Sequence, residues 1–138
     1  MLLPKKVKFR KWQTMRVNPH KTKTETRGTT LAFGNFGLKA ETAGRIRSNQ
    51  LEAGRKTIAR QMQKSGKLWT RVFPDMPFTA KAAEVGMGKG KGDPQGYMVQ
   101  VWPGRLIFEV DGLTDAVAKE ALRKAGAKLP IKTKIVSR

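Results

Sequence analysis

"SNQLEAGRKTIARQMQKSGKLWTRVFPD", residues 48–75, predicts a helix that leads directly into a strand. At about 100° per residue, Leu51, Ile58 and Met62 fall within about 40° of one another and give the helix one apolar face. We therefore expect a helix over residues 49–65 that packs this face against a sheet.

Both ends of the expected helix have residues that commonly begin and end helices. Ser48 or Asn49 is suited to cap the first free amide groups, and Gly66 is suited to the left-handed turn that ends a helix. The next residues, "LWTRVFPD" (68–75), are rich in β-branched and aromatic side chains and stop at Pro74. They predict a strand.

The opposite face of the helix is a row of cations formed by Lys56, Arg60 and Lys64. Like charges four residues apart repel by a few tenths of a kcal/mol per pair unless an anion lies along them. The row is either a solvated face or a phosphate-binding face, and we favour the second interpretation.

The rest of the chain supplies the other elements of the fold. We expect a bent strand over 29–41, a long loop over 76–96, a strand over 97–102, a turn at Pro103-Gly104, a strand over 105–112, a helix over 115–127 capped by Thr114, and a strand over 131–137. This order predicts an α+β fold, a single domain with two helices and a mostly antiparallel sheet.

The composition supports one domain with a real core, because the chain has 138 residues of which 38% are hydrophobic. We expect this core to contain apolar residues from the helices and strands: Leu51, Ile58, Trp69, Val72, Val99, Leu106, Phe108 and Leu122.

The net charge of +19, from 29 Lys and Arg against 10 Asp and Glu, points to a polyanionic partner. A charge this large would repel itself in the folded state unless an anion accompanied it. The absence of cysteine excludes a disulfide scaffold and a zinc-cysteine site. No apolar run approaches the roughly 20 residues that span a bilayer, so we expect no membrane partner.

Most of this charge lies in the N-terminal half, where residues 1–74 hold 18 Lys and Arg against 3 Glu. Residues 1–28 have no sustained helical or strand period, and we interpret them as a basic arm that becomes ordered on its partner, in front of a folded domain over 29–138. Its basic, acid-poor start is similar to a transit peptide, but Pro4 disfavours an amphipathic helix, and we expect it in the mature protein. Phe9 and Trp12 could stack on nucleobases or dock onto the domain.

"EVGMGKGKGDPQGY", residues 84–97, places glycine at every second position from Gly86 to Gly92, with Lys89 and Lys91 between them. A phosphate-binding P-loop needs Ser or Thr after its Gly-Lys pair, and the dinucleotide motif needs a third glycine where this chain has Lys91 or Asp93. The segment is therefore either a mobile solvated loop or a loop whose free backbone approaches a nucleic acid.

The sequence shows no group of residues with the spacing expected of a catalytic site. The single histidine, His20, lies in the basic arm, and the acidic residues of the domain are scattered without metal-ligand spacing: Asp75, Glu84, Asp93, Glu109 and Asp111. We expect no enzyme activity, cofactor, metal ion or small-molecule substrate.

Seven stretches in order along the chain resemble a known family: "PKKVKFRK" (4–11), "FGNFGLKA" (33–40), "NQLEAGRK" (49–56), "GKLWTRVFPDMPFT" (66–79), "MGKGKG" (87–92), "PGRLIFEVDG" (103–112) and "AKLPIKTK" (127–134). They are similar to ribosomal protein sixteen of the large ribosomal subunit, of bacterial or organellar type. "MGKGKG" and "RVFPD" are the most specific of these matches.

The resemblance implies an α+β protein of the cytoplasmic or organellar ribosome that binds large-subunit rRNA near the aminoacyl-tRNA site and helps to position tRNA without catalysis. It also implies neighbouring ribosomal proteins as partners. The alternative that the charge permits is a basic architectural DNA-binding protein.

The candidate rRNA-binding residues are Lys5, Lys6, Lys8, Phe9, Arg10, Lys11, Arg16, Arg45, Arg47, Arg55, Lys56, Arg60, Lys64, Lys67 and Arg71. The candidate loop at the functional centre is Met87, Gly88, Lys89, Gly90, Lys91 and Gly92. The chain departs from many family members at Gly86, where they have arginine, and at Gln95, Gly96 and Tyr97, where they have an acidic residue, Tyr and Trp.

Overall fold

The computed structural model describes residues 1–14, 16 and 18–138, and within them it confirms the α+β fold with two α-helices. The elements are the 3-10 helix η1 (Pro19–Lys21), β1 (Phe36–Ala40), β2 (Gly44–Arg47), α1 (Ser48–Met62), β3 (Lys67–Thr70), β4 (Met76–Ala80), β5 (Asp93–Val101), β6 (Leu106–Asp111), α2 (Asp115–Gly126) and β7 (Thr133–Ser137).

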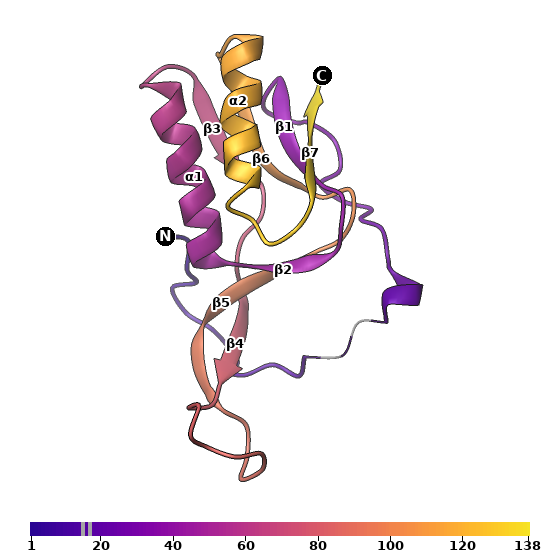
Figure 1. Cartoon of the computed structure of the whole chain (residues 1–138), viewed down its shortest axis with the longest axis vertical. Coiled ribbons are helices and arrows are strands. Elements are labelled where there is room, and N and C mark those ends of the chain that lie inside the picture. Colours follow the sequence, from indigo (N-terminus) through magenta and orange to yellow (C-terminus); the bar gives the residue numbers. More distant parts are fainter. Residues whose placement is uncertain (15, 17) are drawn as a thin grey trace.

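The strands form two antiparallel sheets rather than one (Figure 1). A four-stranded sheet has the order β3-β6-β1-β7, and a three-stranded sheet has the order β2-β5-β4. β5 and β6, which flank the predicted turn at Pro103-Gly104, therefore belong to different sheets, although the turn itself exists. The amide of Gly104 donates to the carbonyl of Ala40 at 2.8 Å, and the connection carries the chain from one sheet to the other.

Two strands lie where no strand was expected. β2 is short, and β4 lies inside the segment predicted as a long loop, which the structure shortens to residues 81–92. β4 is an edge strand, where Pro77 is tolerated because its missing amide hydrogen can face away from the partner. The predicted strands over 29–41 and 68–75 are likewise shorter, because β1 begins at Phe36 and β3 ends at Thr70.

The boundaries of α1 differ from those expected. The capping position is Arg47 rather than Ser48 or Asn49, and the side chain of Gln50 accepts a hydrogen bond from the Arg47 amide at 2.9 Å. The helix ends at Met62 because Gln63 adopts a left-handed conformation with φ 51°. In α2 the predicted cap is confirmed, since the Thr114 hydroxyl accepts from the amide of Val117.

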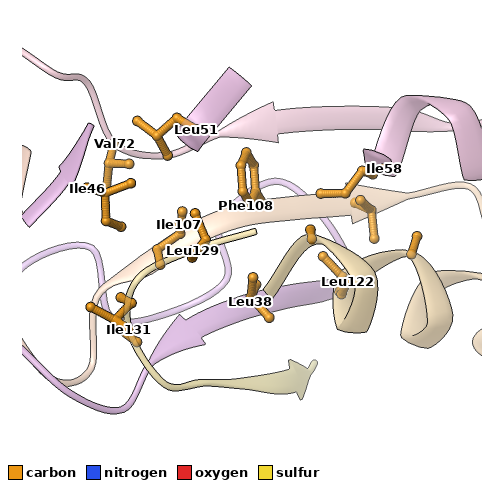
Figure 2. Packing of buried hydrophobic residues seen from close by; sticks show 14 of the residues in the cluster. Leu38, Ile46, Leu51, Ile58, Val72, Ile107, Phe108, Leu122, Leu129 and Ile131 are labelled. Carbon is orange, nitrogen blue, oxygen red and sulfur yellow. The ribbon is translucent and has the colours of Figure 1, made fainter. Parts of the chain in front are cut away.

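The helices pack together on one face of the four-stranded sheet, and side chains of β1, β6 and both helices converge between them (Figure 2). Phe108 is fully buried against Gly54 of α1, where an added Cβ would lie 3.1 Å from the ring. Of the predicted core, six residues are buried: Leu51, Ile58, Val72, Leu106, Phe108 and Leu122. Trp69 and Val99 are only half-buried, Val99 packing on the core from outside.

Truncating Phe108 to Ala is expected to lower the free energy of unfolding by about 3–5 kcal/mol, because it leaves a cavity beneath α1 that the sheet cannot close. Urea denaturation of the full chain measures this loss. The matched control is Phe73→Ala, since Phe73 is 45% exposed and its loss should cost about 1 kcal/mol or less. Equal effects for both variants would contradict the placement of β6 in the core.

Candidate nucleic-acid interface

The Gly-Lys loop, residues 81–92, lies at the tip of the β4–β5 hairpin, which extends away from both helices (Figure 1). The two strands pair from Met76 opposite Met98 to Ala80 opposite Asp93. Residues 80–91 are all exposed. The hairpin thus holds the loop clear of the core while its base stays fixed in the three-stranded sheet.

The conformation of the loop explains part of its glycine pattern. Gly88, Lys89 and Gly90 have positive φ angles of 100°, 60° and 97°, in a region that glycine enters at no steric cost. Gly92 closes the base of the loop, where an added Cβ would lie 2.6 Å from the carbonyl oxygen of Ala80. Gly86 is under neither constraint, because its φ is not positive and an added Cβ would meet no atom within 4 Å.

The basic arm contacts the loop directly. The Lys11 ammonium donates to the carbonyl of Lys91 at 3.2 Å, and the Lys91 ammonium donates to the carbonyl of Trp12. Residues that lie about eighty positions apart in the sequence are therefore neighbours. These contacts bring cations of the arm and of the loop together.

The other candidate residues of the arm are exposed: Lys5, Lys6, Lys8, Phe9, Arg10 and Arg16. The Lys8 ammonium lies 5.5 Å from the centre of the Phe9 ring, which is 60% exposed, so this ring does not dock onto the domain. The end of the arm is joined to the domain, since the amide of Leu106 donates to the carbonyl of Gly28.

Two arginines of β2 lie at the base of the hairpin. The Arg47 guanidinium lies 4.6 Å from the centre of the Phe78 ring, and the Arg45 side chain donates to Gln100 at 3.0 Å. Both contacts join β2 to β4 or β5. These cations therefore support the hairpin as well as adding to its charge.

The predicted row of cations on α1 is only partly helical. Lys56 and Arg60 are exposed on the helix, whereas Lys64 is exposed in the turn beyond its end, with φ 67°. Arg55 forms two hydrogen bonds with Glu52, at 3.1 and 2.6 Å. These bonds lower the pKa of Glu52 and raise the pKa of Arg55, so both groups are ionised at neutral pH.

The two candidate residues around β3 have different surroundings. Lys67 is exposed at the start of the strand. Arg71, by contrast, donates to the fully buried carboxylate of Glu109 at 2.9 Å and lies 5.1 Å from the centre of the Phe33 ring. Arg71 has a structural role, whatever else it contacts.

Sequence reasoning missed the aromatic residues near these cations. Phe33 and Phe73 are 55% and 45% exposed, and Phe33 stacks on Trp69 with ring centres 5.7 Å apart. Only the structure reveals this exposure, because "FGNFG" and "RVFPD" are equally compatible with buried rings. Lys81, whose ammonium donates to the carbonyl of Gly88, is another cation of the loop that the candidate set omitted.

Across the described ranges, no cluster of three or more His, Asp or Glu side chains is arranged to hold a metal ion. In the same ranges, none of the helices has the length and apolar character needed to cross a bilayer.

Comparisons with known proteins agree along the whole chain. The family described as "Ribosomal protein L16p/L10e" matches residues 4–136. The chain is 52% identical to the large ribosomal subunit protein uL16 of Rickettsia rickettsii (strain Sheila Smith) over 138 residues, which is 100% of this chain and 98% of the relative. Over the same shares it is 53% identical to uL16 of Rickettsia massiliae and 50% identical to uL16 of Afipia carboxidovorans.

The salt dependence of RNA binding is the slope of the logarithm of affinity against the logarithm of salt concentration, to which each neutralised phosphate contributes roughly 0.7 to 0.9. Replacing Lys56, Arg60 and Lys64 together by Gln is expected to reduce this slope by about two to three units. Filter binding between about 50 and 200 mM salt measures the slope. The control removes the same charge elsewhere, at Lys119 on α2 and at Lys128 and Lys132 beyond it, all of which are exposed. An unchanged slope in the first variant would mean that this face contacts only solvent.

Proposed function

Because the chain belongs to the ribosomal protein L16p/L10e family, we propose that it binds large-subunit rRNA near the aminoacyl-tRNA site and helps to position tRNA there without catalysing a reaction. Family membership makes it a structural, rRNA-binding protein of the large ribosomal subunit. Its bacterial relatives indicate the cytoplasmic ribosome. Neighbouring ribosomal proteins are its further partners.

The observation that carries the tRNA proposal is the exposed loop at the tip of the β4–β5 hairpin. A loop that only anchored the protein on rRNA could lie anywhere on the basic surface, but this one is held away from the core by two paired strands. Its glycines leave the backbone free to approach another backbone closely. Lys89 and Lys91 supply point charges, which tolerate a moving phosphate better than the fixed geometry of arginine does.

The remaining cations are suited to hold the protein on rRNA. They lie on the arm, on β2, on α1 and at the start of β3, and the arm joins the loop through Lys11 and Lys91. A protein anchored through these surfaces would present the hairpin tip to a second ligand. We assign the rRNA to the anchoring surfaces and the tRNA to the tip.

The second candidate, an architectural DNA-binding protein, rests on the net charge alone. It does not explain a hairpin that carries glycine at alternate positions. Co-sedimentation separates the two functions: the proposed role requires that the full chain sediments with large subunits and prefers rRNA to duplex DNA at equal salt. Equal binding to duplex DNA without co-sedimentation would overturn the proposal.

Replacing Lys89 and Lys91 by Ala is expected to leave subunit assembly nearly normal and to weaken aminoacyl-site tRNA binding by about tenfold, the loss of one or two charge-assisted contacts. Nitrocellulose filter binding of tRNA to reconstituted particles measures the change in tRNA affinity.

The single variants refine this experiment, because Lys91 also donates to the carbonyl of Trp12. Lys89→Ala should weaken tRNA binding without disturbing the arm, and Lys119→Ala on α2 is the matched control. Failed assembly together with normal tRNA binding in the surviving particles would show that the loop anchors rRNA.

Gly86→Arg is expected to fold with an unchanged melting temperature, because the position is open and needs no positive φ. The added guanidinium should raise the salt slope of RNA binding by about one unit. Thermal melting and filter binding measure the two effects. Gly90→Ala is the contrasting variant, since φ 97° strains any side chain there. Equal destabilisation by both substitutions would contradict the loop conformation.

A further inference from the structure

A cavity of about 750 Å³ lies along the free edge of the four-stranded sheet. β3 is the outermost strand there, so one side of its backbone is not paired with another strand of the sheet. The cavity follows this edge and the residues after it, between α1 and the segment before β1. Its walls include three aromatic rings and three guanidinium groups: Phe33, Trp69, Phe73, Arg55, Arg71 and Arg105.

Two of the three aromatic rings are already stacked on each other. Phe33 and Trp69 stack with an interplanar angle of 20°, and the Arg71 guanidinium lies 5.1 Å from the centre of the Phe33 ring. Yet Phe33 is 55% exposed and Phe73 is 45% exposed. Exposed aromatic rings that border a cavity can stack with another planar group.

The positive charges in the wall of the cavity are paired with negative charges. Each arginine in the wall lies beside a carboxylate: Arg55 beside Glu52, Arg71 beside Glu109 and Arg105 beside Glu25. The wall therefore suits an uncharged planar group better than a phosphate.

Exposed lysines lie on either side of this wall. Lys67 borders a smaller cavity that shares Phe33 and Trp69 with the large one. Lys64 borders another that shares Arg55, Leu68 and Thr70. These two ammonium groups are therefore candidates to contact phosphates that flank a planar group in the large cavity.

We propose that this cavity binds an unpaired base of the rRNA, extruded from a loop or bulge, while its flanking phosphates lie on Lys64 and Lys67. Aromatic faces and guanidinium planes stack on unstacked bases, and free amide and carbonyl groups of a strand edge can hydrogen-bond the edge of the base. The proposal rests on rRNA binding and adds a base-binding site to it. A protein segment fits less well, because the bordering cations match a polyanion.

The test uses the full chain and two RNA probes of equal length: a hairpin with one bulged 2-aminopurine, and a fully paired duplex that contains the same base. Phe33→Leu with Phe73→Leu keeps apolar volume but removes the stacking faces. Affinity for the bulged hairpin is expected to fall by about five- to tenfold, while affinity for the duplex stays the same. The quenching of 2-aminopurine emission on binding should disappear.

The ring-retaining pair, Phe33→Tyr with Phe73→Tyr, should restore both the affinity and the quenching, and melting curves establish that each variant is folded. An equal loss on both probes, or no loss on either, would overturn the proposal. A third contrary result is that the Leu variant binds the bulged RNA hairpin normally but its reconstituted particles lose a neighbouring protein. That result would assign the cavity to a protein partner. The tRNA role is tested separately at the loop, so either proposal can fail while the other stands.

Discussion

The outer face of the four-stranded sheet depends on one buried carboxylate. Glu109 of β6 has no exposed surface, and its oxygens accept hydrogen bonds from the amides of Ala32 and Phe33 and from the guanidinium of Arg71. A buried charge with these partners is stable, whereas removing one partner of such a pair typically costs about 3–5 kcal/mol. The two amide contacts join the segment before β1 to the sheet, and the third holds Arg71, whose guanidinium lies 5.1 Å from the centre of the Phe33 ring. The part of the cavity wall that Phe33 and Arg71 form therefore depends on the contacts of Glu109.

The separation of the strands into two sheets has a functional consequence. The four-stranded sheet carries the helices and the core, while the three-stranded sheet contributes few buried residues and supports the hairpin. Because β5 pairs with β2 on one side and β4 on the other, and both β2 and β5 contact α1, the hairpin is held at its base while its tip extends away from both helices (Figure 1). A loop mounted in this way can reach a distant ligand without altering the core, and the arm is attached to it through Lys91.

The sequence predicted the helices, the fold class and most of the core because those features follow from local periodicity. It did not predict the pairing of strands. β5 and β6 are neighbours in sequence around a Pro-Gly turn, yet they belong to different sheets, and the Gly104 amide in that turn donates to the carbonyl of Ala40 in β1. The sequence did not predict β4 because the strand contains Pro77, which indicates a loop. The edge position of β4 tolerates this proline. The exposure of Phe33 was equally inaccessible, because it depends on a contact with Glu109, which lies 76 positions away.

Arginine and lysine have different tasks in this chain, and the difference follows from their geometry. In the folded part, Arg47 lies over a ring, while Arg55 and Arg71 bind carboxylates; a planar guanidinium is suited to such fixed contacts. The lysines on α1, in the turn after it and at the start of β3 are exposed, and a flexible ammonium loses little by exchanging water for a phosphate. The net charge alone therefore does not show that the cations of the basic surface have different roles. The paired arginines of the folded part help to shape the protein, whereas its exposed lysines and Arg60 remain available to neutralise RNA.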